Sequence, residues 1–276
     1  EQCHGCSKCT TVTTATRMCP VYKFTRDETA APKAKANILR ALISGAVAQS
    51  ALYEAGLQDV MAMCVNCGSC YAECPSNVNI PKLVMEAKAH YVRRFGVGRA
   101  AYLTANVEPA ARLLHRFSPV IAPLARLGPV RRAAGCLTGL AAERELVTFA
   151  RRPLHQRVPA LLPAAGPRVL YYAGCYAAYI RPQLGEAAIK LLHHMGMQVH
   201  IAPQHCCGLP QLSKGMADAA RAKAAANLKA WRDLLPRIDY IAVTCSSCGY
   251  ALMQDWSYLL GGKAADRVRA ATVHIS

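Results

Sequence analysis

Short segments with the length and residue content of strands alternate with amphipathic segments in the last part of the chain. Strands are expected at 169–173, 198–201 and 240–243, and helices at 182–195 and 215–235. Strands that alternate with helices along the chain predict a parallel sheet with helices on its faces. We therefore expect an α/β fold for this part of the protein.

The first part of the chain has a helical pattern instead. Pro32 begins an expected helix over 33–44, and Ser50 is expected to cap a second one over 51–63. A third helix is expected from Asn79-Ile80-Pro81 to about Arg94, because its apolar residues share one face. These helices are expected to frame the cysteines of the same region.

Residues 96–164 form a basic segment in which Ala, Leu, Arg and Pro dominate. Ten Arg stand against three Glu from Arg99 to Arg157, and the arginines interleave with apolar residues. This pattern predicts short basic amphipathic helices. They are expected to break at four prolines, namely Pro109, Pro119, Pro123 and Pro129. Two interpretations stay open, a linker packed on the neighbouring domains and a segment that contacts a membrane surface or membrane subunit.

Composition and charge narrow the setting in which the chain works. The formal net charge of +17 leaves a basic surface that suits nucleic acid, anionic lipid or an acidic protein partner. No leader peptide precedes the first cysteine and no run of 18 apolar residues is present, so we expect a cytoplasmic protein. Because the sequence starts at Glu1 and stops at Ser276 directly after an apolar stretch, we also expect a fragment.

The fourteen cysteines are clustered along the chain, as metal ligands in a reducing compartment are. Cys64-Val-Asn-Cys67-Gly-Ser-Cys70-Tyr-Ala-Glu-Cys74-Pro75 has the bacterial ferredoxin spacing C-x2-C-x2-C-x3-C-P. In such a run, three thiolates wrap one [4Fe–4S] cluster and the fourth is directed to a neighbouring cluster. Zinc is the weaker alternative, because it takes four ligands and usually pairs two C-x2-C knuckles.

An N-terminal group of cysteines supplies the partner set. It has the same spacing up to its third cysteine, and a Thr-rich insertion of nine residues then precedes Cys19-Pro20. Because the fourth cysteine of each run is directed to the other run's cluster, we assign one cluster to Cys3, Cys6, Cys9 and Cys74. By the same rule, we assign the other cluster to Cys64, Cys67, Cys70 and Cys19. Eight cysteines thus serve two [4Fe–4S] clusters with none left over.

Five further cysteines follow the expected strands of the α/β part: Cys175, then Cys206 and Cys207, then Cys245 and Cys248. The carboxyl ends of parallel strands meet at one edge of a sheet, where such folds build their binding crevices. We therefore expect these five thiols to converge. Gly174, Gly208 and Gly249 lie beside them, and their missing side chains would let the backbone approach a bound group closely.

This pattern resembles the CCG cysteine-rich domain family, whose motif is C-x(n)-C-C-G-x(n)-C-x-x-C. The domain occurs in heterodisulfide reductase catalytic subunits, in iron–sulfur subunits of glycolate and lactate oxidation, and in the C subunit of anaerobic glycerol-3-phosphate dehydrogenase. Cys206-Cys207-Gly208-Leu209-Pro210 with Ser213-Lys214-Gly215 looks most like the last of these. Met18–Tyr22 and Glu73–Val78 resemble iron–sulfur modules of flavin-linked D-2-hydroxyacid dehydrogenases.

The expected fold class is α+β with α/β. It comprises an all-helical two-cluster ferredoxin-like module at 1–95, the basic helical linker at 96–164 and a parallel α/β CCG domain at 165–276. The resemblance implies a third iron–sulfur cluster, cubane or noncubane, on Cys175, Cys206, Cys207, Cys245 and Cys248; zinc or an empty thiol site is the alternative. Because the family usually has two CCG domains and some members are fused behind a flavin domain, either domain would be missing from a fragment.

Two functions are compared. In the first, the chain carries electrons from a flavin-dependent dehydrogenase, acting on a 2-hydroxy acid or glycerol-3-phosphate, to a quinone or another acceptor at the cytoplasmic face of a membrane. In the second, the CCG site itself reduces a disulfide. Nothing in the sequence resembles a flavin or nicotinamide site, so an electron-transfer subunit or domain is favoured over a stand-alone enzyme. Nucleic acid is not an expected partner, because aromatic stacking runs and DNA-binding patterns are lacking.

A few cysteine and histidine residues are expected to have no part in this chemistry. Cys136 lies alone in a stretch of small and apolar residues and is expected to be a buried hydrophobic residue. His193 and His194 fall at the end of an expected helix, where exposure explains them. His205 has a better claim to a site because it precedes Cys206.

Overall fold

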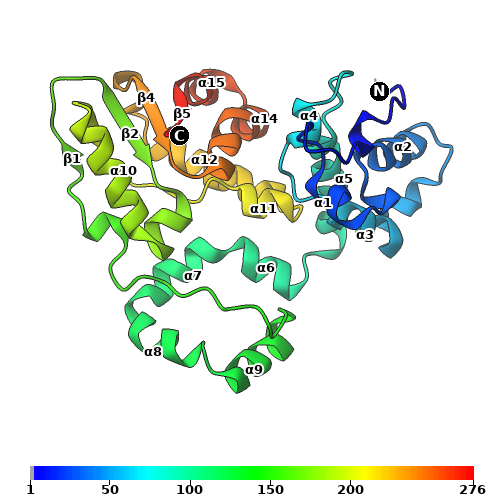
Figure 1. Cartoon of the computed structure of the whole chain (residues 1–276), viewed down its shortest axis with the longest axis horizontal. Helices are drawn as coiled ribbons and strands as arrows, with labels where there is room; N and C mark the ends of the chain where they lie inside the picture. The colour runs from blue at the N-terminus through cyan, green and yellow to red at the C-terminus, as the bar shows by residue number, and fades with distance from the viewer. Residues whose placement is uncertain (1–2) are drawn as a thin grey trace. The chain divides into compact units, whose positions relative to one another are not determined.

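The computed structural model describes residues 3–276, and Glu1 lies outside the described residues. The described chain divides into two compact units (Figure 1). The first unit consists of residues up to 97 together with 212–217, and the second of 98–211 together with 218–276. The basic segment from residue 98 onward thus belongs to the same unit as the sheet. The three-part division expected from the sequence stays a prediction.

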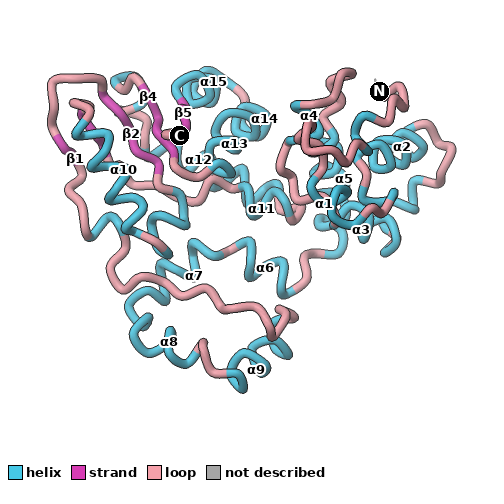
Figure 2. Tube along the Cα trace, viewed as in Figure 1, coloured by secondary structure: helices cyan, strands magenta, loops and turns pink. Residues whose placement is uncertain are grey.

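Helices build the described part of the first unit (Figure 2). They are α1 (Pro20–Thr25), α2 (Pro32–Ile43), α3 (Ala55–Ala62), α4 (Ser69–Ala72) and α5 (Ile80–Phe95), with 3-10 helices at Lys8–Thr10, Glu28–Ala30 and Gln49–Tyr53. The helices expected over 33–44 and from Asn79 are confirmed as α2 and α5. The Asn79 side chain caps α5 by accepting a hydrogen bond from the Lys82 N–H at 3.1 Å. Gly96, in the left-handed region at φ 75°, ends this helix.

The helix expected over 51–63 is wrong at its beginning. A 3-10 helix occupies Gln49–Tyr53, and Glu54 then has extended backbone (φ −82°, ψ 145°) before α3 begins. Ser50 lies inside the 3-10 helix and caps nothing. The extended residue interrupts the series of helical hydrogen bonds, so one expected helix becomes two elements.

The hydrophobic core of the first unit lies between α2, α3 and α5. Its buried side chains include Leu39, Leu42, Leu57, Met61, Val84 and Ala87. Each aliphatic side chain of this size stabilises the fold by about 1.5–3 kcal/mol when fully buried. Cysteines from both ends of the region pack against this core: Cys3, Cys9, Cys64, Cys70 and Cys74. The core therefore holds the two cysteine loops together.

A five-stranded sheet lies in the described part of the second unit, in the order β1-β3-β2-β4-β5. The strands are β1 (Leu161–Leu162), β2 (Arg168–Tyr172), β3 (Gln198–His200), β4 (Tyr240–Val243) and β5 (Thr272–His274). β2 pairs in parallel with β3 and β4, and β5 pairs in parallel with β4. The two-residue β1 pairs antiparallel with β3. The three expected strands and their parallel pairing are confirmed, and the sheet as a whole is mixed.

Alternate residues of the central strands face two separate cores. Leu170 and Tyr172 of β2 pack in one core with residues of α12 (Ala217–Ala230) and α15 (Gly262–Ala271). Val169 and Tyr171 pack in the other core with α10 (Pro182–His194). Because successive strand residues point to opposite faces, helices cover both faces of the sheet. The second unit also contains α11 (Leu209–Ser213, in part), α13 (Ser246–Tyr250) and α14 (Trp256–Leu260), π-helices at Tyr176–Ile180 and Ala251–Asp255, and 3-10 helices at His115–Phe117, Leu154–Gln156 and Leu235–Arg237.

Short helices form the basic segment, as expected, and two of the breaks between them fall next to Pro119 and Pro129, whereas Pro109 and Pro123 lie inside helices. The helices are α6 (Arg99–Ala105), α7 (Val107–Leu114), α8 (Ser118–Leu124) and α9 (Gly128–Thr138). Pro119 and Pro129 lie in the first turn of α8 and α9, and Pro109 is the third residue of α7. Only Pro123 of this group lies further inside a helix. The first N–H groups of a helix have no helical partner, so proline begins these helices without loss.

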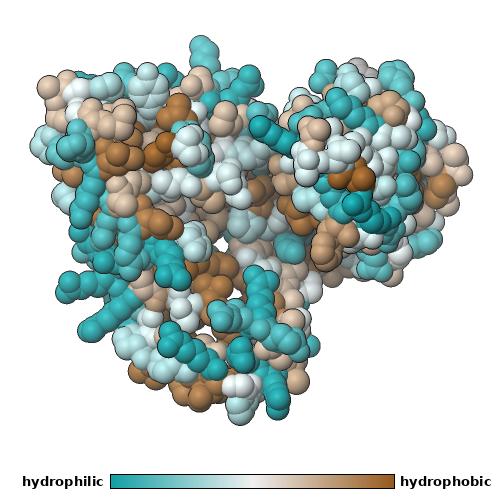
Figure 3. Space-filling model, viewed as in Figure 1, coloured by the Kyte–Doolittle hydropathy of each residue, from teal (hydrophilic) through white to brown (hydrophobic). Residues whose placement is uncertain are grey.

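The expected burial of Cys136 is wrong. Cys136 is exposed on α9. This helix packs on α6, and its remaining face, which carries Cys136, lies in solvent. Apolar side chains of the same segment are also exposed, with 70% for Leu113, 63% for Val120 and 70% for Leu137. Hydrophobic and hydrophilic side chains interleave on the surface over α8 and α9 (Figure 3). The segment therefore presents a mixed basic and apolar surface.

Candidate iron–sulfur sites

The two C-x2-C-x2-C loops of the first unit use left-handed backbone at equivalent positions. In the first loop, Gly5 (φ 68°) and Ser7 (φ 57°) flank the second cysteine. In the second loop, Asn66 (φ 58°) and Gly68 (φ 77°) flank it. Turns of this kind direct successive backbone N–H groups into a concavity that accepts anions, and many iron–sulfur sites are built in this way. The two loops therefore share a backbone conformation that fits a negatively charged cluster.

One cavity of the first unit gathers cysteines that are distant in the sequence. Its lining includes Cys3, Cys6, Cys9 and Cys74, together with Cys70. Apolar side chains such as Met18, Val78 and Ile80 complete the wall. The structure thus brings together the four cysteines that the ferredoxin spacing groups as one set. Their assignment as ligands of one cluster stays a prediction.

A second cavity gathers the other set, Cys19, Cys64, Cys67 and Cys70. Burial raises the pKa of Cys70 to about 12 and also raises the pKa of Cys64. Free thiols of this kind stay protonated at neutral pH, so they ionise only when a metal cation binds them. Sulfur ligands in a water-poor setting are the chemistry that iron–sulfur clusters require.

Two lysines lie beside the second cavity. Lys35 is 2% exposed, and its Nζ donates hydrogen bonds to the carbonyl oxygens of Thr29 at 3.1 Å and Ala30 at 2.7 Å. The Nζ of Lys88 donates to the carbonyl oxygen of Cys64 at 2.9 Å. Burial lowers the pKa of both lysines, to about 8 for Lys88, and nearby thiolates act in the opposite direction. Negative charge in this cavity would favour the charged form of both side chains.

The five cysteines of the second unit come together, as their positions after parallel strands predict. Neighbouring thiols are in hydrogen-bond contact in the order Cys175, Cys206, Cys207, Cys248 and Cys245. Hydrogen bonds from the thiols of Cys175 and Cys207 lower the pKa of Cys206. The hydrogen bond to Cys206, with burial, raises the pKa of Cys175. The five sulfur atoms thus form one continuous group.

Glycine is required where this group meets the sheet. Gly174 has φ 63°, and a Cβ built on it would lie 2.7 Å from the Sγ of Cys248. Any side chain there would collide with a thiol and would also strain the backbone. The absence of a side chain lets the end of β2 approach the cysteine group, as expected from the sequence. π-Helices follow Cys175 and Cys248 closely, and such distortions are frequent at functional sites.

Buried hydrogen bonds fix the loop that carries the adjacent cysteines. The Tyr172 hydroxyl donates to the carbonyl oxygen of His205 at 2.7 Å, and the Trp256 Nε1–H donates to that of Cys207 at 2.8 Å. The Oδ1 of Asn227, which is fully buried, accepts a hydrogen bond from the His205 N–H at 2.8 Å. Buried polar groups that are paired in this way hold a loop in one conformation.

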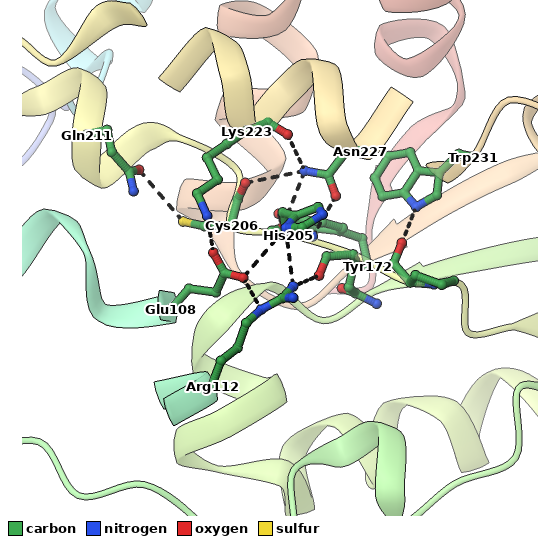
Figure 4. A network of polar contacts seen from close by, with 11 residues as sticks. Glu108, Arg112, Tyr172, His205, Cys206, Gln211, Lys223, Asn227 and Trp231 are labelled. Carbon is green, nitrogen blue, oxygen red and sulfur yellow. Dashed lines mark hydrogen bonds and ion pairs between the residues drawn. The ribbon is translucent and has the colours of Figure 1, made fainter. Parts of the chain in front are cut away.

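A network of ion pairs lies beside this loop (Figure 4), and the sequence did not predict it. Glu108 of α7 is 2% exposed and forms ion pairs with Arg112 on the next turn and with Lys223 of α12, where Nζ and Oε2 are 2.6 Å apart. Arg112 Nη2 donates to the carbonyl oxygen of Gln204 at 2.9 Å. His205 Nδ1 lies 3.7 Å from Glu108. Contacts between residues so distant in the chain leave no local pattern, and nothing in the sequence separates Glu108 from the two other Glu of the basic segment.

The described structure thus contains two cavities lined by the cysteines with ferredoxin spacing, and a third group of thiols that converge after the strands of a parallel sheet. Comparison with known families agrees. Residues 1–78 match the 4Fe-4S dicluster domain, and residues 169–253 match the cysteine-rich domain CCG. The chain combines these two domains, and the resemblance inferred from the sequence is confirmed.

Curated relatives match most of this chain. The C subunit of the anaerobic glycerol-3-phosphate dehydrogenase of Escherichia coli is 28% identical over 272 residues, which cover 94% of this chain and 63% of the relative. The probable glycolate oxidase iron–sulfur subunit of Bacillus subtilis is 25% identical, covering 88% and 57%. The glycolate oxidase iron–sulfur subunit of Escherichia coli is 23% identical, covering 97% and 61%.

The chain spans less than two thirds of the length of these relatives. No solved structure matches it at a significant level. Among residues 3–276, none of the helices combines the length and the apolar character needed to cross a membrane.

Proposed function

We propose that this chain is an iron–sulfur electron-transfer subunit or domain. It would take electrons from a flavin-dependent dehydrogenase of a 2-hydroxy acid or glycerol-3-phosphate and pass them to a quinone or another acceptor. The observation that carries the proposal is the pair of cavities in the first unit, which together gather the eight cysteines of the two runs, with Cys70 in the wall of both. Two one-electron carriers suit a flavin donor, which can release its two electrons singly. Relatives named as a subunit of a dehydrogenase and as iron–sulfur subunits of glycolate oxidases support this role.

Two [4Fe–4S] clusters would reside in an all-helical ferredoxin-like module. The ligands of one would be Cys3, Cys6, Cys9 and Cys74, and those of the other Cys64, Cys67, Cys70 and Cys19. Reversible one-electron transfer is the chemistry that these groups supply when bound. The chain would contribute the thiolates and the apolar side chains of the cavity walls. Lys35 and Lys88 contribute positive charge near the second set, which stabilises negative charge there.

In the second unit, the group of five cysteines would hold a third iron–sulfur cluster. Support comes from the continuous thiol contacts and from the position of Cys207, which is 4% exposed in the middle of the group. Zinc takes four ligands, fewer than the five thiols gathered here. A zinc or empty thiol site that only shapes a partner-binding surface is the alternative that metal analysis separates from the cluster.

The basic segment supports a peripheral position at the cytoplasmic face of a membrane. Its exposed apolar side chains lie among arginines, an arrangement suited to anionic lipid or to a membrane subunit. A flavin-containing subunit, or a fused flavin domain, would be the electron donor. Both partners are inferences from the surface and from the relatives.

A redox titration of anaerobically prepared protein, followed by low-temperature electron paramagnetic resonance, tests this function. We expect one-electron transitions from two interacting clusters in the first unit and a further transition from the second unit. The Cys70→Ala variant should lose one of the first two transitions. Its control, Cys136→Ala, changes an exposed cysteine outside the three groups and should retain all of them. Protein that takes up no electrons in one-electron steps would contradict the proposed function.

A further inference from the structure

A cavity of about 370 Å³ lies beside the cysteine group of the second unit. Cys175 and Cys206 form part of its wall. Most of the remaining wall is apolar and includes Leu154, Val158, Tyr179 and Ile201. Cavities of this size, with apolar walls and a few polar groups, are typical of sites for small organic molecules. A ligand in this cavity would lie next to the sulfur atoms of the proposed third cluster.

The polar groups of the cavity gather on the side where α7 meets the loop after β3 (Figure 4). Arg112 and His205 lie there, with Nη2 and Nδ1 3.2 Å apart. Glu108 is buried behind them and orients the guanidinium group through their ion pair. Because this carboxylate faces both Arg112 and Lys223, one positive charge remains in excess. This side can therefore donate hydrogen bonds and stabilise negative charge that develops on a ligand.

We propose that this cavity binds the ring of a quinone, which serves as the electron acceptor; the inference rests on the function proposed above. A quinone ring is flat and apolar, and its two carbonyl oxygens accept hydrogen bonds. These properties match apolar walls with donors on one side. One quinone takes two electrons, which arrive singly from the dehydrogenase through the clusters, and two protons from water, and it leaves as a quinol. Electrons and protons therefore balance without a further reactant.

Charged metabolites match this cavity less well than a quinone. A carboxylate would need its charge paired inside mostly apolar walls. The guanidinium group of Arg112 is already held by Glu108 and by the carbonyl oxygen of Gln204, so a charged ligand would compete with these partners for its donors. A charged ligand loses its hydration when it enters such a cavity, whereas an uncharged ring gains negative charge only when it is reduced.

The surface next to the cavity suits a quinone carried in a membrane. Leu113 and Phe117 follow Arg112 closely in the chain, and they are 70% and 59% exposed. These side chains offer exposed apolar surface in the segment that also carries Arg112 of the cavity wall. A quinone with a long apolar tail could thus keep its tail on lipid while its ring enters the protein.

Binding of menadione, a quinone ring without a tail, tests the proposal independently of turnover. Calorimetric titration would use the oxidised protein with its clusters intact. Val158→Trp should fill the cavity and weaken binding at least tenfold, because Val158 is a half-buried wall residue. Ala160 is an exposed wall residue, so Ala160→Trp provides a second variant with a filled cavity should Val158→Trp fail to fold. Arg112→Gln should weaken binding several-fold, whereas Arg116→Gln, exposed and outside the wall, should not change it.

Menadione binding that is equally strong in the two filled variants, or that is absent up to its solubility limit, would overturn the proposal. Binding of oxidised glutathione in the same cavity, with no binding of menadione, would also overturn it and would favour disulfide reduction. The redox titration separates these results from failure of the proposed function. Normal one-electron transitions without menadione binding would reject the quinone site alone.

Discussion

At Gly174, two separate constraints exclude every other residue. Its φ of 63° lies in the left-handed region, and a Cβ would lie 2.7 Å from the Sγ of Cys248. The left-handed backbone costs an ordinary residue about 1–2 kcal/mol, and forced overlap in a packed site costs about 1–3 kcal/mol more. Gly174→Ala should therefore lower the free energy of unfolding by about 2–5 kcal/mol and reduce iron binding in the second unit.

Gly196→Ala is the matched control for this prediction. Gly196 also has a positive φ, 81°, but a Cβ there would meet no atom within 4 Å. Only the backbone cost of about 1–2 kcal/mol is expected. Urea unfolding followed by tryptophan fluorescence measures both variants, because the two tryptophans of the chain, Trp231 and Trp256, lie in the second unit. Equal losses in the two variants would show that the contact with Cys248 is unimportant.

Asp255 makes stability depend on pH. It is 5% exposed, and its Oδ2 has no hydrogen-bond partner among the described residues. Burial raises the pKa of this carboxyl to about 7, whereas an unfolded chain has about 3.9. The folded state thus binds more protons between these values. The contribution of Asp255 to stability is therefore fully present below about pH 4 and is lost as the pH rises through about 7.

The Asp255→Asn variant should lose this pH dependence. At pH 8 its free energy of unfolding should exceed that of the parent by about 2–4 kcal/mol. The control is Asp266→Asn on α15, which changes an exposed carboxylate. Urea unfolding at pH 5 and pH 8 is the measurement. If the difference in unfolding free energy between Asp255→Asn and the parent is the same at pH 5 and at pH 8, the carboxyl of Asp255 does not ionise near neutrality in the folded protein.

Within the second unit, Glu108 links helix α7 to α12 and to the loop after β3. Glu108→Gln leaves Arg112 and Lys223 without their shared anion. Loss of one member of a fully buried ion pair costs about 3–5 kcal/mol. Since Arg112 is 44% and Lys223 23% exposed, solvent reduces the expected loss in unfolding free energy to about 1–3 kcal/mol.

Glu186→Gln is the control for this element. Glu186 pairs with Arg157 at 2.6 Å, but both side chains are partly exposed, at 23% and 29%. Its loss should cost below about 1 kcal/mol. Tryptophan fluorescence in urea compares the two variants. The account of α7 fails if Glu108→Gln is no less stable than Glu186→Gln.

Local pattern predicts the longer elements and misses the shorter ones. The helices α2, α5 and α10 and the strands β2, β3 and β4 each carry a pattern of apolar residues that their burial requires. β1 has two residues, too few for any pattern, and the three-residue β5 depends on pairing with β4. The extended backbone at Glu54, which divides an expected helix, likewise has no local signal.

At the scale of the whole molecule, cysteine spacing groups the thiols but does not describe their surroundings. Ferredoxin spacing predicts the two sets of four cysteines that the cavities gather, but not that Cys70 lines both cavities. Strand order predicts the convergence of the other five. The cavity beside Cys175 and its ion network depend on Glu108, Arg112 and Lys223, which only the tertiary fold brings together. The exposure of Cys136 likewise depends on how little of α9 the rest of the unit covers.

The most direct test of the central claim is a count of iron and acid-labile sulfide in protein purified without oxygen. At least about eight irons with equal sulfide are expected, four for each cluster of the first unit. A third cluster in the second unit would raise the count to about twelve irons. These additional irons should be lost in Cys207→Ala, whereas Cys136→Ala should match the parent. Folded protein that contains zinc and no sulfide would contradict the assignment of this chain as an iron–sulfur electron carrier.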